Sequence, residues 1–404
     1  MPDEAVFFPV EAPLGQLPLT LRWLNDPRTR RIMELLGGDC QARFVGGAVR
    51  DGLLGRETDD IDIATVLYPP AVASALNPEF RVLPIGARFG SVAVFLDGGL
   101  AVQITTLRRD IRTDGRRAVV EFSDSWLEDS RRRDFTMNAL YADLAGRVYD
   151  YQDGIKDLGR GLVRFIGDAQ ARIAEDRLRA LRFWRFFARY GQGKPDREAC
   201  LSCRAAASSG ALARLSNERI AQEMGKIFGS PRADSVLRLM AEYEVLPAVM
   251  AATPEGLDIL QQLVFLEEGG VVHPMASPDS LRRLAAVGEA PPWVAKRADR
   301  KRLAAARRLA FGQGPLSMRD IAFAEGALVA TDALLLRWAA QRARSGGKVG
   351  GDNYLAALDF LRDNPPEDSP ARASDYPGLT GPALGAALSE TTRRWLSARP
   401  DMKV

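Results

Sequence analysis

Residues 44–65 read FVGGAVRDGLLGRETDDIDIAT, and this stretch decides the fold class. It opens with a short β-branched and aromatic run, which predicts a strand, and turns at Gly46 and Gly47 into a helix predicted over residues 48–54. A second strand, predicted over residues 61–63, follows directly. The order strand, glycine turn, helix, strand indicates a mixed α/β domain.

Two carboxylates stand at the second of these strands. Asp60 and Asp62 are two residues apart, so their side chains point to one face, while Ile61 points to the other. Two carboxylates at one point repel each other unless a cation lies between them, and Mg²⁺ prefers oxygen ligands. A DxD pair alone is also common at solvated strand ends. We predict that Asp60 and Asp62 are catalytic residues that bind Mg²⁺.

The glycine turn just before this pair is typical of a phosphate-binding loop. It exposes backbone N–H groups and the positive end of a helix dipole, and a Cβ at either glycine would block the approach of a triphosphate. Arg50 lies one helical turn further on and can reach the same anion. We therefore predict that Gly46, Gly47 and Arg50 bind a nucleotide. A plain glycine turn would leave the adjacent DxD strand unexplained.

The chain changes character near Asp168. Before it, further strands are predicted over residues 91–95 and 101–105. After it, apolar residues recur every three or four positions in long predicted helices. Clear examples are residues 171–190, 216–228 and 233–243. The predicted fold class is therefore α/β plus all-α, a mixed α/β head followed by helices.

Composition narrows the possible functions. The 404 residues are 46% hydrophobic and 26% charged, which is typical of a globular chain of several domains, and no apolar run is long enough to span a membrane. The N-terminus lacks the features of a signal peptide, so we expect a cytoplasmic protein. Three cysteines and one histidine disfavour a disulfide framework and a Ser-His-Asp site. Carboxylates, arginines and metal ions are left for the chemistry.

The glycine turn and DxD strand resemble those of the class II CCA-adding enzyme and bacterial poly(A) polymerase family. Four later segments resemble family motifs in the same order. They are residues 129–139 (sugar recognition, RRDxxxN), 150–158 (a flexible hinge), 175–182 (base recognition) and 215–223 (a brace for the base-recognition helix). Five motifs in one order, between about residues 41 and 228, make the resemblance specific.

The resemblance implies a polymerase-beta-like nucleotidyltransferase head followed by a helical neck, body and tail. The expected divisions are an N-terminal helical segment (1–36), the head (37–166), a neck for nucleobase recognition (167–230), an RNA-binding body (231–305) and an RNA-binding tail (306–404). In the body and tail the resemblance is weaker and rests on the basic residues 297–308 and on residues 381–385 with Trp395.

The resemblance also implies further nucleotide-binding residues. In the sugar-recognition motif these are Arg133, Asp134 and Asn138, with Arg133 the better candidate for the phosphates. In the base-recognition segment they are Glu175, Asp176, Arg179, Arg182 and Arg185. The RNA-binding candidates are Lys296, Arg297, Arg300, Lys301, Arg302, Arg307 and Arg308, for which an ordinary solvated charged face is nearly as good an interpretation.

Asp176 and Arg179 suggest how the protein itself selects bases. Cytosine and adenine both present an amino donor beside a ring-nitrogen acceptor, whereas guanine and uracil present the reverse. Residues three apart on a helix share a face, so a carboxylate beside a guanidinium would match the first pair and oppose the second. An ordinary helix salt bridge is the alternative interpretation.

By this resemblance the protein adds CMP and AMP to the 3′ end of tRNA from CTP and ATP, with two Mg²⁺ ions and release of pyrophosphate. One departure bears on the metal site, because Gln103 stands where the family often carries a glutamate. Two alternatives remain open. One is a poly(A) polymerase, which shares these motifs, and the other is a non-catalytic tRNA-binding scaffold.

Overall fold

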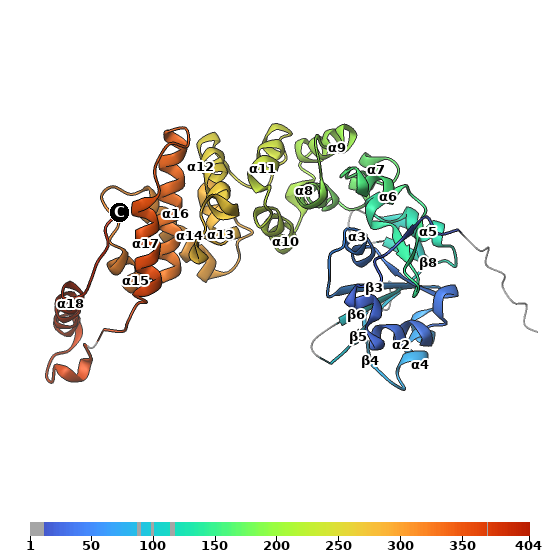
Figure 1. Cartoon of the computed structure of the whole chain (residues 1–404), viewed down its shortest axis with the longest axis horizontal. Helices are drawn as coiled ribbons and strands as arrows, with labels where there is room; N and C mark the ends of the chain where they lie inside the picture. Colours follow the sequence, from blue (N-terminus) through green and yellow to red (C-terminus); the bar gives the residue numbers. More distant parts are fainter. Residues whose placement is uncertain (1–11, 87–89, 98–100, 114–117, 370) are drawn as a thin grey trace, which may run out of the picture. The chain divides into compact units, whose positions relative to one another are not determined.

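The computed structural model describes residues 12–86, 90–97, 101–113, 118–369 and 371–404. The chain forms two compact units, Met1–Ala211 (unit 1) and Leu212–Val404 (unit 2), which are described separately (Figure 1). Unit 1 contains a mixed sheet with helices and unit 2 is built from helices. The predicted fold class, α/β plus all-α, is confirmed, while the division into five parts stays a prediction.

An eight-stranded sheet organises unit 1, with the strand order β1-β10-β9-β2-β3-β6-β5-β4. Its strands are β1 (Gly15–Gln16), β2 (Ala42–Val45), β3 (Asp60–Thr65), β4 (Arg81–Gly86), β5 (Ser91–Phe95), β6 (Ala101–Thr106), β9 (Leu140–Ala142) and β10 (Arg147–Asp150). Strands β3 and β6 run parallel, and the other neighbours are antiparallel. A separate ribbon pairs β7 (Arg108–Thr113) with β8 (Ala118–Phe122). The predicted strands all lie in the main sheet.

Strand β3 is central because one of its faces is apolar. Ile61 and Ile63 are almost fully buried, at 1% and 0% exposed. The alternation of a strand then directs Asp60 and Asp62 to the opposite face. The sequence of β3 thus places two carboxylates in the middle of a sheet whose neighbouring strands hold them rigidly.

Unit 1 also contains helices. They are α1 (Arg22–Asn25), α2 (Pro27–Leu35), α3 (Gly47–Leu53), α4 (Pro69–Leu76), α5 (Trp126–Arg131), α6 (Gly154–Gly159), α7 (Ala169–Glu175), α8 (Arg179–Tyr190) and α9 (Arg197–Ser208). Aromatic packing attaches α8 to the head, since Phe183 and Phe186 pack on Phe135 with ring centroids 6.5 and 5.2 Å apart. Burial of these large side chains is the main stabilising contribution of this contact.

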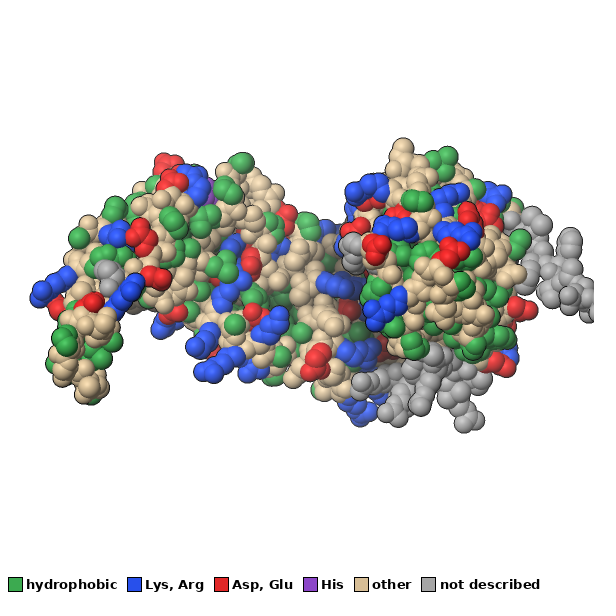
Figure 2. Space-filling view, turned by 90° about the horizontal axis from the view of Figure 1, so that it is seen from below, with side chains coloured by type: hydrophobic (Ala, Val, Ile, Leu, Met, Phe, Trp, Pro, Cys, Tyr) green, Lys and Arg blue, Asp and Glu red, His purple; other side chains and the backbone are tan. Residues whose placement is uncertain are grey.

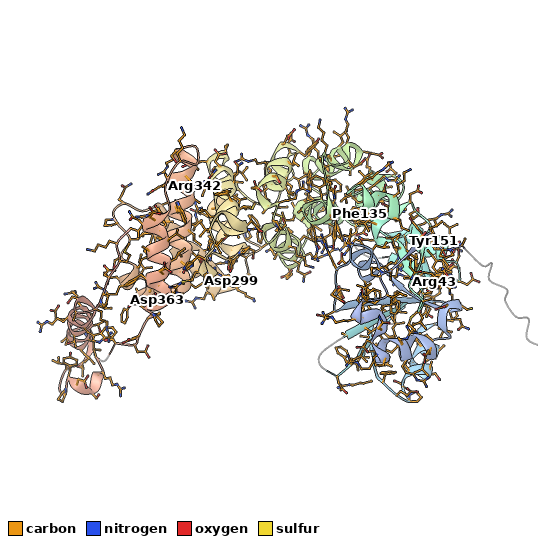
Figure 3. The ribbon with its side chains drawn as sticks, in the orientation of Figure 1. Arg43, Phe135, Tyr151, Asp299, Arg342 and Asp363 are labelled. Atoms are coloured by element: carbon orange, nitrogen blue, oxygen red, sulfur yellow. The ribbon has the colours of Figure 1, made fainter. Side chains whose placement is uncertain are left out.

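Strand β2 carries a buried cation, Arg43. The Arg43 guanidinium lies 3.8 Å from the ring centre of Tyr149 and 4.4 Å from that of Trp126. Its Nη1 donates to the hydroxyl of Tyr151 at 2.7 Å, and Figure 3 shows these two side chains next to each other. Aromatic faces and one hydroxyl compensate the burial of this charge.

The helix predicted over residues 171–190 is wrong as a single element. Helix α7 ends at Glu175 and α8 begins at Arg179, because Asp176 has extended backbone angles (φ −145°, ψ 107°). The Asp176 carboxylate accepts the N–H of Leu178 at 3.1 Å. An aspartate that bonds a nearby backbone N–H competes with the helical hydrogen bond, and the helix breaks there.

Unit 2 is a succession of helices. They are α10 (Asn217–Phe228), α11 (Ala233–Glu242), α12 (Pro254–Phe265), α13 (Ser280–Val287), α14 (Arg297–Phe311), α15 (Met318–Glu325), α16 (Ala327–Arg344), α17 (Asp352–Asp363) and α18 (Gly381–Ser397). The helices predicted over residues 216–228 and 233–243 are confirmed as α10 and α11. Among the helices of the described chain, none has the length and apolar character needed to cross a bilayer.

A buried ionic network joins α13 and α16 to the segment Leu266–Gly270, which follows α12. Arg283 is fully buried and donates to Glu267 at 2.5 Å, while Arg282 donates to Glu267 at 2.7 Å and to Asp332 at 2.8 Å. Arg302 on α14 donates to the other oxygen of Asp332 at 2.7 Å. Each buried charge is therefore matched by an opposite charge, which makes its burial tolerable.

Candidate active site

Asp60 and Asp62 lie on one face of β3, with Asp60 exposed and Asp62 half-buried. Burial and the negative charge of Asp60 raise the pKa of Asp62 to about 6, against the opposing effect of Arg133. Two mutually repelling carboxylates of this kind suit a divalent cation with oxygen ligands. In the described part of the chain, no three His, Cys, Asp or Glu side chains gather as a possible metal site. Oxygens from outside the protein would complete the coordination.

Gln103 lies beside this pair. It is the register partner of Asp62 on the parallel strand β6, so the two side chains share a face, and Gln103 is exposed there. An amide oxygen is a weaker Mg²⁺ ligand than a carboxylate because it carries no charge. The site therefore presents two negative charges, both on β3, beside a neutral amide on β6.

The glycine turn lies close to Arg133 and Asn138. Gly46 has φ +72°, a conformation that favours glycine, and its N–H donates to the carbonyl of Leu140 at 3.0 Å. A Cβ at Gly46 would lie 3.6 Å from the Asn138 carbonyl oxygen and 3.7 Å from Nη1 of Arg133. Gly47 follows as the first residue of α3. Phosphate binding by these two glycines stays a prediction.

The Arg133 guanidinium is held from behind by a buried carboxylate. Its Nη2 and Nε donate to Asp129 Oδ2 at 2.9 and 3.2 Å, and Tyr141 donates its hydroxyl to the same oxygen at 2.7 Å. Asp129 is fully buried. Burial opposes its ionisation, but the charges of Arg133 and Arg132 hold the pKa of Asp129 well below its usual range. The Nη1 end of Arg133 is thereby fixed near Gly46, and its charge acts on Asp62.

Asp134 and Asn138 are buried and bonded to each other, with Asn138 Nδ2 donating to Asp134 Oδ1 at 3.0 Å. Asp134 Oδ2 accepts from Nε and Nη2 of Arg182 at 2.8 and 2.5 Å. Burial opposes its ionisation, but Arg182 and the Asn138 hydrogen bond lower the pKa of Asp134 to about 2. Arg50 is also buried and donates to Asn138 Oδ1 at 2.5 Å. Three predicted nucleotide-binding side chains therefore form one network with Arg182.

The base-recognition segment is arranged differently from the prediction. Because the helix breaks at Asp176, the argument that Asp176 and Arg179 share one helical face is wrong. Arg179 instead donates to Glu175 at 2.5 Å, and its Nη2 donates to the Arg132 carbonyl at 3.3 Å. The Arg185 guanidinium lies 4.4 Å from the ring centre of Phe186. The roles of these residues in base reading stay predictions.

The basic side chains predicted to bind RNA divide into two groups on α14 and at its N-cap. Arg302 is paired with Asp279 and Asp332, and Arg307 donates to the carbonyl of Ala285, so both are tied to unit 2 itself. The exposed members are Lys296, Arg297, Arg300, Lys301 and Arg308. Figure 2 shows that acidic side chains are interspersed with basic ones on the face it presents.

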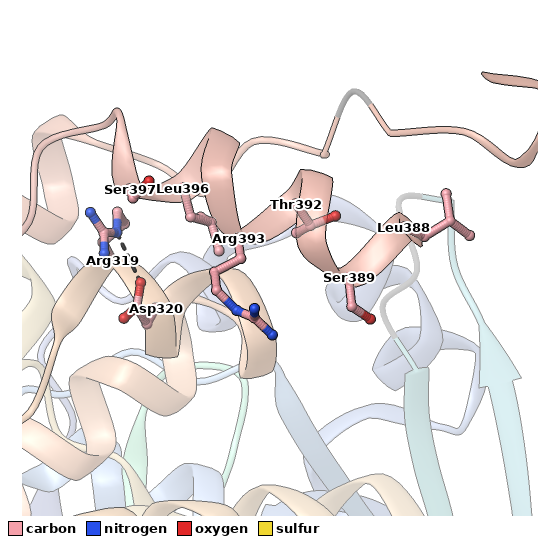
Figure 4. Close-up of a pocket in the computed structure, with 8 residues that line it drawn as sticks. All are labelled: Arg319, Asp320, Leu388, Ser389, Thr392, Arg393, Leu396 and Ser397. Carbon is pink, nitrogen blue, oxygen red and sulfur yellow. Dashed lines mark hydrogen bonds and ion pairs between the residues drawn. The ribbon is translucent and has the colours of Figure 1, made fainter. Parts of the chain in front are cut away.

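A groove in unit 2 lies between α15 and α18. It is lined by Arg319, Ser389, Thr392 and Arg393 among others (Figure 4). Arg319 is bonded to Asp320 at 2.9 Å and Arg393 to Glu390 at 2.6 Å. The groove belongs to unit 2, whereas the predicted catalytic and nucleotide-binding residues belong to unit 1.

Sequence reasoning missed four residues that support the site. Asp129 and Tyr141 hold Arg133, while Asp51 and Tyr190 hold Arg50. Asp129 opens the sugar-recognition motif, and Asp51 directly follows Arg50 in the sequence. The positions of these two aspartates next to predicted site residues could have identified them. Tyr190 is 139 residues from Asp51 in the chain, and nothing in the sequence links the two.

Parts of the chain are similar in sequence to known nucleotidyltransferases. The family model "Poly A polymerase head domain" matches residues 42–164, and "Probable RNA and SrmB- binding site of polymerase A" matches residues 196–256. The mitochondrial CCA tRNA nucleotidyltransferase 1 of Danio rerio is 38% identical over 219 residues, which are 52% of this chain and 50% of that protein. The CCA-adding enzyme of Geobacillus stearothermophilus is 39% identical over 214 residues, 52% of this chain and 51% of the relative.

Residues 42–164 are therefore similar to the poly(A) polymerase head domain, and about half of the chain is similar in sequence to CCA-adding enzymes. The chain spans about half the length of the curated relatives it matches. The structural likeness to CCA-adding enzymes covers more of the chain than the sequence likeness does. The Bacillus stearothermophilus CCA-adding enzyme in complex with CTP superposes with a TM-score of 0.64 at 26% identity, over 92% of this chain and 94% of that one. The Thermotoga maritima enzyme complexed with tRNA shares the fold, with a TM-score of 0.62 at 19% identity over 93% of each chain.

Proposed function

We propose that this protein adds CMP and AMP to the 3′ end of tRNA, taking them from CTP and ATP. The observation that carries the proposal is the position of Arg133, whose guanidinium lies near the Gly46 turn and acts electrostatically on Asp62. A cation between a glycine turn and a carboxylate pair suits a nucleoside triphosphate. The likeness to CCA-adding enzymes supports tRNA as the acceptor.

The reaction is a phosphoryl transfer. The 3′ oxygen of the tRNA forms a bond to the α-phosphorus, the bond from that phosphorus to the bridging oxygen breaks, and pyrophosphate leaves. Asp60 and Asp62 would hold divalent ions, and bound Mg²⁺ lowers the pKa of the attacking hydroxyl and neutralises triphosphate charge. Arg133 binds the triphosphate, while Asn138 and Asp134 bind the ribose. Such a protein is expected in the cytoplasm.

Base selection is assigned to the segment around the break between α7 and α8. Asp176, at the break, and Arg179, the first residue of α8, supply one acceptor and one set of donors. Glu175 holds the Arg179 guanidinium at 2.5 Å and orients it. Arg182 and Arg185 continue along α8 and face the triphosphate or base. The exposed cations of α14 are assigned to the tRNA backbone.

The deciding experiment supplies tRNA that lacks its 3′ end with CTP alone, with ATP alone, and with both. Incorporation of CMP from CTP alone supports CCA addition. Tailing of unstructured RNA with ATP only would identify a poly(A) polymerase instead. Protein that is inert with Mg²⁺ and CTP would support the non-catalytic scaffold.

A matched pair of variants tests the carboxylates in the same assay. Asp60→Ala should abolish incorporation and leave tRNA affinity close to that of the wild type. Asp59→Ala is the control, because Asp59 is the neighbouring exposed carboxylate and lies just before β3 begins. Equal loss in both variants would contradict the assignment of Asp60.

A further inference from the structure

A continuous chain of hydrogen bonds leaves helix α8 and returns to it. At the C-terminal end of α8, the hydroxyl of Tyr190 donates to Asp51 Oδ1 on α3 at 2.8 Å. Asp51 also accepts from the next side chain, with Arg50 Nε and Nη2 each 3.1 Å from its two oxygens. The Arg50 guanidinium lies 4.3 Å from the Tyr190 ring centre, so Tyr190 contacts both members of this pair.

The same chain continues through the predicted sugar-binding residues. Arg50 Nη1 donates to Asn138 Oδ1 at 2.5 Å, and Asn138 Nδ2 donates to Asp134 Oδ1 at 3.0 Å. Asp134 Oδ2 accepts from Arg182, which returns the chain to the N-terminal half of α8. We call this set the α8 polar chain, and its members are Tyr190, Asp51, Arg50, Asn138, Asp134 and Arg182.

The chemistry of the neighbours fixes the direction of the Asn138 amide. Arg50 can only donate, so it must face the amide oxygen, and the Asp134 carboxylate can only accept, so it must face the amide nitrogen. A flipped amide would set donor against donor and acceptor against acceptor. The orientation of Asn138 therefore depends on Arg50 being held in place.

Burial makes this dependence strong. Arg50, Asp51 and Asn138 are only 6%, 6% and 8% exposed. In such surroundings hydrogen bonds are strengthened, and removal of one partner leaves a buried polar group without compensation. Burial raises the pKa of Tyr190, which keeps its hydroxyl protonated as the donor to Asp51. A change at Tyr190 or Asp51 should therefore alter the position of Asn138, the predicted ribose contact.

We propose that Asp51 and Tyr190 are positioning residues for ribose recognition, because they hold Arg50 and Arg50 fixes the amide of Asn138. The proposal rests on the proposed function, since it assigns the ribose to Asn138. It adds that the helix carrying the base-reading arginines also sets the sugar contact. Neither Asp51 nor Tyr190 touches the nucleotide in this scheme.

The test compares binding of CTP and dCTP, which differ only in the 2′ hydroxyl. Tyr190→Phe removes the bond to Asp51 and keeps the aromatic ring against Arg50. It should reduce the preference for CTP over dCTP by about threefold to tenfold, the effect of one buried hydrogen bond. Asp51→Asn should act in the same direction. The control is Tyr68→Phe, an exposed tyrosine outside the α8 polar chain, which should leave the preference unchanged.

A wild-type preference for CTP that survives intact in Tyr190→Phe would overturn the proposal. If wild-type protein fails to bind CTP, the proposed function is contradicted. The energetic coupling between Tyr190 and Asn138 can then still be measured in the absence of nucleotide. Thermal unfolding of Tyr190→Phe, Asn138→Ala and the double variant gives three shifts in Tm. A double-variant shift smaller than the sum supports coupling along the α8 polar chain, and fully additive shifts overturn it.

Discussion

Gln103 lies directly opposite Asp62 on the neighbouring parallel strand, with both side chains on the same face of the sheet. This relationship would set how much negative charge a bound divalent ion meets, because a glutamate in the same place would add a third carboxylate. The parallel pairing of β3 with β6 fixes the register over all six residues of β3, so Gln103 cannot slide away from Asp62 without moving the whole strand.

Gln103→Glu should therefore tighten divalent-ion binding. We expect the Mg²⁺ concentration for half-maximal nucleotide incorporation to fall by roughly threefold to tenfold, since a nearby carboxylate attracts the ion more strongly than an amide. Gln103→Ala is the control and should change this concentration little. A glutamate variant that needs as much Mg²⁺ as the wild type would show that residue 103 lies outside the metal site.

Asp62→Asn should stabilise the metal-free protein at neutral and higher pH. The pKa of Asp62 is raised to about 6 in the folded state, so its ionisation costs stability. That cost is fully present above pH 6 and absent below the unfolded value of about 4, and the asparagine removes it. In EDTA at pH 8 we expect a gain of about 1–2 kcal/mol in the free energy of unfolding. The gain should vanish at pH 4, and a pH-independent gain would contradict the explanation.

Tyr141→Phe should weaken triphosphate binding by releasing one of the groups that hold Asp129 and Arg133. Loss of this hydrogen bond is expected to raise the Kd for CTP about fivefold, a free-energy change of about 1 kcal/mol. CMP, which lacks the outer phosphates, should bind as before. Tyr149→Phe is the matched control, because its hydroxyl bonds to Asp143 instead. Equal losses for CTP and CMP would mean a general disturbance of the head.

Asp176→Ala should relax base selection. Removal of the carboxylate takes away one of the two groups assigned to the base edge, and the preference for CTP over UTP should fall about tenfold. Glu175→Ala should have a similar effect through Arg179, which it holds. Incorporation of all four nucleotides, measured in competition, provides the check. Unchanged ratios would exclude Asp176 from base reading.

Replacing two neighbouring cations on α14 should have different effects, one on tRNA binding and the other on the stability of unit 2. Lys301→Ala should weaken tRNA binding and reduce the dependence of affinity on salt by about one ion, as expected for an exposed phosphate contact. Arg302→Ala should instead destabilise unit 2 by roughly 2 kcal/mol, because Asp279 loses its ion pair and Asp332 keeps only Arg282. Affinity at several salt concentrations and thermal unfolding separate the two effects.

The sequence predicts correctly those features of the candidate site that depend on neighbouring residues in the chain. Alternation around Ile61 and Ile63 correctly directed the carboxylates of β3 to one face, and the glycine turn was placed at the start of α3. The break at Asp176 was missed because apolar periodicity continues across it, while a single side-chain hydrogen bond decides the backbone there. The bond from Tyr190 to Asp51 was also beyond sequence reasoning, since only the folded chain brings α8 and α3 together.

The ionic network that joins α13 and α16 to the segment Leu266–Gly270 constrains how unit 2 can evolve. Replacing any one of Arg282, Arg283, Glu267 or Asp332 by an apolar residue takes away one partner of an opposite charge in the core, which destabilises unit 2. Replacing all four together carries no such penalty. We therefore expect related chains to keep the whole set or to lose it as a whole, so that these four positions are inherited as one unit.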